Sequence, residues 1–342
     1  MLAKKHFVAF FIIAVIVFSC RKSDDIDIIE FIGFEKPKHF PEPIYNFSSS
    51  NITKETFELG KKLFYDPILS RDNTISCGSC HISQNAFTHH GHDVSHGIDD
   101  QLGTRNTMPL MNLAWSPYFF WDGGVHDLDL SPIAPIENPI EMDENMNNVV
   151  EKLKSSKQYF DLFKAAFGDS EINTSRILKS ISHFMLMMTS ANSKYDQVKS
   201  GKYQFTDNED QGYKIFKQHC ASCHQEPLFT DYSFRDNGIG INPANDLGRY
   251  TITNDPSDKL KFKVPSLRNL KYTMPYMHDG RFYTIRAVIN HYINEIQNTP
   301  NLDPLLKNSK AIKLDENEIN NLIAFLNTLN DEEFINNKIF EE

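Results

Sequence analysis

Cysteine is scarce in this sequence, positive charge is in deficit, and the apolar run near the N-terminus is short. The 342 residues include five cysteines, and 35 lysines and arginines against 45 acidic residues give a formal net charge of -10. This negative charge argues against nucleic acid as a partner, because phosphate would be repelled. The apolar run from Phe7 to Phe18 is too short for a transmembrane helix.

That run belongs to an N-terminal segment with the features of a bacterial export signal. Lys4 and Lys5 precede it, and the following Val17-Phe18-Ser19-Cys20 resembles a lipobox, in which the cysteine is acylated and becomes the first mature residue. We interpret residues 1–20 as a lipoprotein signal peptide and expect a lipid-anchored protein in the periplasm or cell envelope. Ordinary secretion with Cys20 discarded is the alternative, and it too places the protein outside the cytoplasm.

The next segment, residues 21–50, has no sustained helical period. It contains Pro37, Pro41 and Pro43 and ends in three consecutive serines. We interpret it as a tether leading into a loose N-terminal arm.

The remaining four cysteines lie in two C-x-x-C-H motifs, Cys77-Gly78-Ser79-Cys80-His81 and Cys220-Ala221-Ser222-Cys223-His224. Two thiols at this spacing can add across the vinyl groups of one porphyrin, and the adjacent histidine then falls beneath the iron as proximal ligand. A redox dithiol or half of a zinc site has the same cysteine spacing. Because both copies carry the histidine and no other thiol remains in the mature chain, the pattern favours two covalently bound c-type haems.

A similar helical pattern precedes each haem motif. Thr53 can cap a helix running to about Phe64, with Gly60 on its inner face, and Gly212 holds the matching place before the second motif. A glycine on this face would let two helices approach closely.

Later helices complete each half of the chain. One apolar stripe covers residues 177–188, where we assign Met185, Met187 and Met188 to the core; another covers residues 314–329, with Asp315 and Glu318 as a capping box. The patterns predict an all-α fold of two cytochrome c-like helical domains, residues 51–201 and 202–342, each carrying one haem.

Further segments carry a resemblance to a known family. From about Pro41 to Leu329 the chain resembles the bacterial di-haem cytochrome c peroxidases, in the wider group that includes the MauG-like enzymes. Besides the haem motifs, the likeness rests on the shared order of four segments: Gly60–Asp66, Phe120–Gly123, Val264–Asn269 and Pro275–Gly280.

The resemblance implies different tasks for the two haems. The N-terminal haem, on Cys77, Cys80 and His81, would reduce peroxide. The C-terminal haem, on Cys220, Cys223 and His224, would accept electrons from outside.

His96 matches the family's distal ligand of the peroxidatic haem, which must leave the iron on activation. The same loop holds His89, His90 and His92, which are alternative ligands or a solvated metal-binding patch. Some MauG-like enzymes leave this iron five-coordinate, which is the competing interpretation.

Two further pocket residues follow from the likeness. Glu141 holds the position of a carboxyl that shuttles a proton to the departing oxygen, a task that needs a pKa raised by desolvation. Trp121 matches the tryptophan between the haems, where it can relay electrons and also pack in the core. Where the family often has glutamine this chain has Ser131, which puts the usual distal hydrogen bond in doubt.

The second haem's sixth ligand is expected to be Tyr292. In the peroxidases a methionine stands fourteen positions after the histidine that matches His278, and here that position is tyrosine, as in MauG-like enzymes. A phenolate favours oxidised iron, whereas a thioether favours ferrous iron. Met277 and His291 are the nearby alternatives.

Calcium is expected only from the resemblance. The family binds it between the domains through an asparagine side chain and two backbone carbonyls, and Asn106, Thr273 and Pro275 match those positions. So few protein oxygens leave almost no signature in a sequence.

The resemblance implies a cytochrome-c-peroxidase-type oxidoreductase that reduces hydrogen peroxide to water. Expected partners are a small electron-donor protein such as a cytochrome c, a membrane through the lipid anchor, and a second copy of the chain in a homodimer; none is nucleic acid. One alternative is a MauG-like oxidase acting on a protein or organic substrate, although Gln218 stands where MauG has a hole-transferring tryptophan. Another is a non-catalytic di-haem electron carrier.

Overall fold

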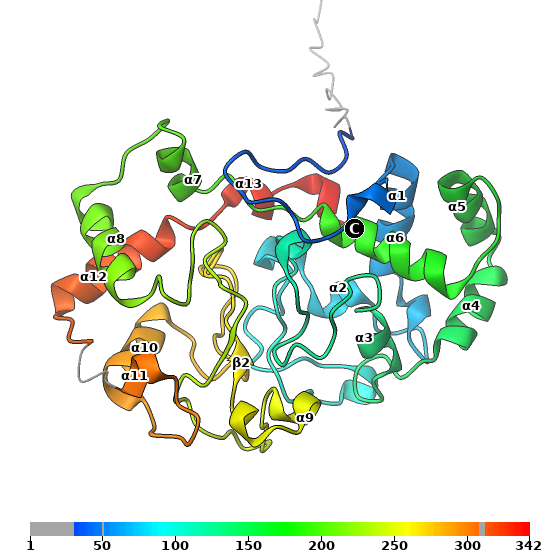
Figure 1. The fold of residues 1–342 in the computed structure, drawn as a ribbon. Helices are drawn as coiled ribbons and strands as arrows, with labels where there is room; N and C mark the ends of the chain where they lie inside the picture. The colour runs from blue at the N-terminus through cyan, green and yellow to red at the C-terminus, as the bar shows by residue number, and fades with distance from the viewer. Residues whose placement is uncertain (1–30, 50, 308–311) are drawn as a thin grey trace, which may run out of the picture. The chain divides into compact units, whose positions relative to one another are not determined.

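Two pairs of packed helices, one in each half of the sequence, organise the structure (Figure 1). α1 (Lys54–Tyr65) packs against α6 (Thr174–Leu186), and α8 (Asp207–His219) packs against α12 (Glu316–Asn327). The computed structural model describes residues 31–49, 51–307 and 312–342, and Ile32–Glu342 forms one compact unit. The export signal expected in residues 1–20, with Cys20, lies outside the described residues.

Glycine permits the close approach in both pairs. A Cβ atom on Gly60 would collide with the backbone carbonyl of Ser180, and one on Gly212 would collide with the carbonyl of Asn321. The prediction that these glycines let two helices approach closely is confirmed.

The predicted helix starts are also confirmed. The Thr53 side chain accepts a hydrogen bond from the backbone of Thr56 at the start of α1, and Asp315 and Glu318 form a capping box at the start of α12. Each cap satisfies backbone N–H groups that the helix itself leaves unpaired, an effect typically of about 1 kcal/mol.

The described residues are helical apart from loops and one short antiparallel ribbon, so the all-α class is confirmed. The ribbon joins β1 (Phe234–Arg235) to β2 (Phe262–Lys263). The shorter helices are α2 (Cys77–Cys80), α3 (Ile133–Glu137), α4 (Met146–Lys154), α5 (Lys157–Phe167), α7 (Lys194–Lys199), α9 (Tyr250–Thr253), α10 (Ile285–Asn290), α11 (Pro304–Lys307) and α13 (Glu332–Ile335). None of the described helices is long and apolar enough to cross a membrane.

Segments from each half pack into the other. Tyr195, on α7, belongs to the aromatic core around Phe325 of α12. In return, Phe334 and Phe340 near the C-terminus lie with ring centroids 6.1 and 6.0 Å from that of Phe87, just after the first haem motif. The domain boundary expected at residue 201 stays a prediction.

The N-terminal arm is anchored at Phe40 and is not loose there, whereas the rest of the expectation for residues 21–50 stays a prediction. Phe40 is 3% exposed and its ring lies 5.0 Å from the Trp115 ring, centroid to centroid. The Trp115 indole donates a hydrogen bond to the Pro41 carbonyl over 2.8 Å. Aromatic burial holds this segment although it has no helical period.

Candidate haem-binding and peroxidatic site

The first haem motif presents its histidine as a metal ligand. His81 follows α2 directly, and its Nδ1 lies 2.7 Å from the carbonyl oxygen of Phe87. Burial lowers the pKa of His81 to about 4, against the opposing effect of this hydrogen bond. The imidazole is therefore neutral, and with Nδ1 donating to Phe87 its Nε2 lone pair is free for iron.

The second motif repeats this arrangement with two acceptors. Cys220 follows α8, and the Nδ1 of His224 lies 3.1 Å from the carbonyl oxygens of both Phe229 and Pro265. Burial is again the main influence on the ring and lowers the pKa of His224.

The four described cysteines lack the electrostatic environment of a redox dithiol. Cys77, Cys80, Cys220 and Cys223 are free of disulfides. Burial raises the pKa of Cys77 to about 12 and that of Cys80 to about 11. Catalytic redox cysteines have lowered pKa values, so these thiols fit covalent attachment of haem better.

The loops of His96 and Glu141 meet beside Cys80. The Cys80 thiol lies 3.5 Å from the His96 carbonyl oxygen, and the N–H of Ile98 donates to the Glu141 carbonyl over 2.7 Å. Gly97 allows this contact, because a Cβ there would collide with the Glu141 backbone. The first attachment site and both predicted pocket residues thus share one neighbourhood.

The Glu141 carboxyl has the electrostatics expected of a proton shuttle. Burial raises its pKa, while a hydrogen bond from the Asn138 side chain to Oε1, 2.7 Å long, opposes the rise. Ser131 is buried and its hydroxyl donates to the Leu128 carbonyl over 2.9 Å, within its own turn.

The histidines of the distal loop form a cluster. His89 and His92 stack with ring centroids 4.0 Å apart, and His92 Nδ1 lies 3.3 Å from His96 Nε2. The other nitrogen of His96 lies 3.2 Å from a carboxylate oxygen of Asp100. In the described part of the chain, Nδ1 of His89 is buried with no hydrogen-bond partner. In this cluster His89 thus carries a buried nitrogen with no hydrogen-bond partner.

Trp121 lies where the two halves of the sequence touch. It is 7% exposed, its indole N–H donates to the Asn106 carbonyl over 2.9 Å, and its own carbonyl accepts from the Lys263 N–H over 2.7 Å. Asn106 is in turn joined to the second half, since its N–H donates to the His278 carbonyl over 2.7 Å.

The three residues expected to bind calcium border the same loop. The Asn106 side chain lies 3.2 and 3.1 Å from the carbonyl oxygens of His92 and Asp93, and the N–H of Gly91 donates to the carbonyl of Met274, between Thr273 and Pro275, over 3.3 Å. Among the described residues there is no cluster of three or more histidine, cysteine or acidic side chains suited to a metal ion.

Tyr292 lies within electrostatic range of the second attachment site. It lies in η7 (His291–Glu295), a π-helical turn after α10, and such turns often occur at functional sites. Burial raises its pKa to about 12, a hydrogen bond from Asn237 opposes this, and the charges of Cys220 and Cys223 add to the rise.

The rival ligands of this second site are close by. The Asn237 amide lies 3.4 Å from the Tyr292 hydroxyl and 3.6 Å from the Met277 sulfur, so these two side chains flank it. His291 Nε2 is engaged with the Asn237 carbonyl oxygen over 3.0 Å.

Comparison with known proteins agrees with this geometry. The profile of the family described as "Di-haem cytochrome c peroxidase" matches residues 54–204, and the "Cytochrome c" profile matches residues 209–330. The methylamine utilization protein MauG of Methylorubrum extorquens is 35% identical over 308 residues, covering 86% of this chain and 83% of that protein. The chain belongs to the di-haem cytochrome c peroxidase family. Two covalent haem c groups follow from this membership.

Two other relatives represent both branches of this di-haem peroxidase family. The cytochrome c551 peroxidase of Nitrosomonas europaea is 33% identical over 285 residues, covering 80% of this chain and 79% of that protein. The crystal structure of a MauG-like protein associated with microbial copper homeostasis matches with a TM-score of 0.83 at 31% identity, covering 90% of this chain and 98% of the other.

Several contacts of this di-haem peroxidase were missed by sequence reasoning. The hydrogen-bond partner of Glu141 is Asn138, three residues earlier. The Asn138-Pro139 pair predicts a turn, and that turn was the available signal that the two side chains lie close together. No comparable signal marks Asn237 beside Tyr292, because 55 positions separate them.

Proposed function

We propose that the chain reduces hydrogen peroxide to water at the first haem, with electrons delivered through the second haem by a small redox protein. The observation that carries this proposal is the partly buried Glu141 carboxyl, whose pKa burial raises, beside the Cys80 attachment site. When bound, the two haem irons would supply the two electrons that cleavage of the O–O bond requires.

Glu141 moves the proton in this scheme. Peroxide placed near Cys80 and the His96 loop would lose its outer oxygen as water only if a proton reaches that oxygen. A desolvated carboxyl stays protonated closer to neutral pH and can deliver it. Asn138 holds the carboxyl in one orientation, because its side chain contacts Oε1.

Trp121 bridges the halves in this proposal. Its ring is buried, and its hydrogen bonds to Asn106 and Lys263 fix it between segments that follow different haem motifs. A fixed aromatic ring between two redox centres gives electrons a path across the gap.

Tyr292 favours a second candidate function, a MauG-like oxidase. A phenolate on the second iron would stabilise its oxidised state, so this haem would store oxidising rather than reducing equivalents. Such an enzyme would draw electrons from a protein or organic substrate. Gln218, exposed on α8, lacks the aromatic ring for the surface route that MauG uses.

Adding peroxide to the half-reduced protein in a stopped-flow spectrometer tests the proposal. Rapid reoxidation that continues as a reduced cytochrome c is consumed supports the peroxidase. Rapid reaction of the fully oxidised protein, without such consumption, favours the MauG-like oxidase. Slow bleaching in both experiments would identify an electron carrier and overturn both proposals.

The lipid anchor, the calcium ion and the homodimer are parts of the same proposal. Replacement of Cys20 by alanine should release the protein from membranes without loss of haem, because the anchor contributes only membrane affinity. A chelator should remove calcium from around Asn106, Thr273 and Pro275 and lower the rate of electron transfer between the haems. Sedimentation should give twice the chain mass if a homodimer forms.

A further inference from the structure

The proximal histidine of the second haem depends on carbonyls from two separate segments. Nδ1 of His224 is shared between Phe229 and Pro265, each 3.1 Å away. A metal-ligating histidine that donates its other N–H to a carbonyl is oriented by that bond and becomes a more basic ligand. The relative position of these two segments therefore governs both the angle and the basicity of the ring.

Three side chains join the two segments. The Ser266 hydroxyl donates to the Leu228 carbonyl over 2.7 Å, and the Thr230 hydroxyl donates to the Val264 carbonyl over 2.6 Å. The third is Arg268, whose Nε and Nη2 donate to the Pro227 carbonyl over 3.0 and 2.7 Å.

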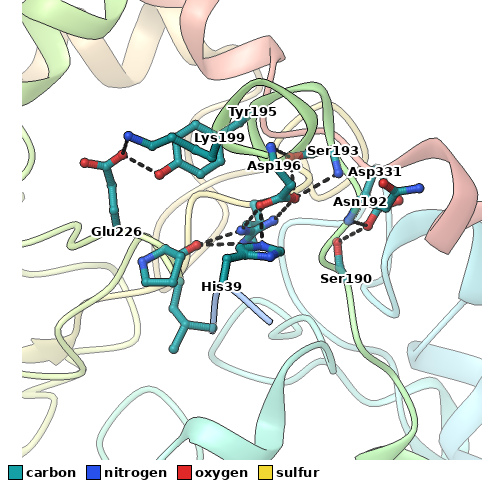
Figure 2. Close-up of polar contacts among 12 residues, drawn as sticks. His39, Ser190, Asn192, Ser193, Tyr195, Asp196, Lys199, Glu226 and Asp331 are labelled. Atoms are coloured by element: carbon teal, nitrogen blue, oxygen red, sulfur yellow. Dashed lines mark hydrogen bonds and ion pairs between the residues drawn. The ribbon is translucent and has the colours of Figure 1, made fainter. Parts of the chain in front are cut away.

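Arg268 is itself held in one place. Its side chain is 0% exposed, and its two terminal nitrogens donate to the Asp196 carboxylate over 2.8 and 2.7 Å. Asp196 lies on α7 and also binds Ser193 and His39, which Figure 2 shows around it. The Phe40 ring of the N-terminal arm covers the guanidinium, 5.0 Å from its centroid.

α7 also contacts the segment around Pro227 directly, through Glu226. Glu226, which precedes Pro227, accepts a hydrogen bond from the Tyr195 hydroxyl. It also forms an ion pair with Lys199, whose Nζ is 3.4 Å from the Glu226 carboxylate (Figure 2). Tyr195 and Lys199 thus contact Glu226 directly, and Asp196 acts on Pro227 through Arg268, so α7 holds the segment just after the second haem motif.

We propose that Arg268, clamped by Asp196 and covered by the N-terminal arm, is a positioning residue for the second haem: it fixes the carbonyls that receive the Nδ1 proton of His224. The first haem has a different arrangement, because His81 donates to one carbonyl, that of Phe87, over 2.7 Å. The proposal requires a haem on His224 but not peroxide turnover, so it stands whichever function proves correct.

Arg268→Lys is the informative substitution because it preserves the charge. A lysine is a point charge that cannot contact Asp196 and the Pro227 carbonyl in the bidentate way of arginine. We expect weaker hydrogen bonds to His224, hence a less basic ligand and an upward shift of the midpoint potential of the second haem alone. The low-spin signal of that haem in electron paramagnetic resonance spectra should shift, because it depends on the strength of the axial ligands. Arg286→Lys, at a surface pair with Glu316, is the matched control and should leave both haems unchanged.

Other outcomes would overturn the proposal. If Arg268→Lys folds and both potentials and the paramagnetic resonance signal match wild type, Arg268 does not position His224. If both haems shift equally, its role is general stability. Should Arg268→Lys fail to fold, Ser266→Ala removes one of the same joining bonds without changing charge. It should raise the second potential by a smaller amount, and no shift in it would refute the proposal.

Discussion

The side chain of Asn138 holds the Glu141 carboxyl through a hydrogen bond of 2.7 Å, in a turn that also contacts the distal loop. Burial and this bond act on the carboxyl in opposite directions, since burial disfavours the charged form whereas an N–H donor favours it. The contact therefore decides both where the carboxyl points and how far its pKa rises.

Replacing Glu141 with glutamine should slow peroxide turnover while leaving both haem spectra intact. Glutamine has nearly the same shape but cannot deliver a proton, and the loss of a positioned proton donor typically costs roughly a hundredfold or more. Steady-state turnover with reduced cytochrome c measures the effect. Full activity in Glu141→Gln would remove this residue from the mechanism.

Replacing Asn138 with alanine should move the pH profile rather than abolish activity. Without the donor the Glu141 pKa rises further, so the carboxyl stays protonated to higher pH. The pH–rate limb that reports Glu141 should shift upward, because the hydrogen bond that favours the charged carboxylate is lost. In a Glu141→Gln background the Asn138 change should produce no such shift, and an equal shift there would show that the limb belongs to another group.

The distal loop offers two histidines that spectroscopy can separate. We expect a low-spin first haem in the resting protein, with His96→Gly converting it to high spin and His89→Gly leaving it unchanged. For His96 to bind iron its ring must leave Asp100 and His92, which contact its two nitrogens. Electron paramagnetic resonance of the three proteins distinguishes the cases. Conversion by His89→Gly instead would assign the ligand role to His89, whose Nδ1 is buried. A high-spin wild type would mean an open site.

Local sequence signals account for the parts of the fold that were predicted correctly. The caps at Thr53 and Asp315 depend on residues three positions apart, and the glycines at 60 and 212 lie on apolar helix faces. Such patterns are readable because one helix turn determines them.

Long-range contacts could not be predicted in this way. Arg268 and Asp196 are 72 positions apart, and Tyr65 donates to the carbonyl of Phe340, 275 positions away. A buried arginine carries no mark of its partner in the sequence, and arginine is ordinarily expected to be exposed. The anchoring of the N-terminal arm at Phe40 could not be predicted for a similar reason, because the burial of one isolated aromatic side chain leaves no periodic pattern in the sequence.

The second haem's axial ligand provides the last prediction. A tyrosine hydroxyl is protonated at neutral pH even when exposed, and burial raises the pKa of Tyr292 further, to about 12. A bound phenolate therefore requires the positive charge of the iron. Tyr292→Phe should therefore change the spectrum of the second haem and raise its potential by on the order of 0.1 V, a fraction of the roughly 0.8 V over which axial ligands act. Met277→Leu and His291→Ala are the matched controls, because the Met277 sulfur shares the Asn237 amide with Tyr292 and His291 Nε2 contacts the Asn237 carbonyl. Potentiometry with optical spectra of all three variants decides the ligand. An unaltered second haem in Tyr292→Phe, together with conversion to high spin in either control, would transfer the ligand role to that control residue and remove the main argument for MauG-like chemistry.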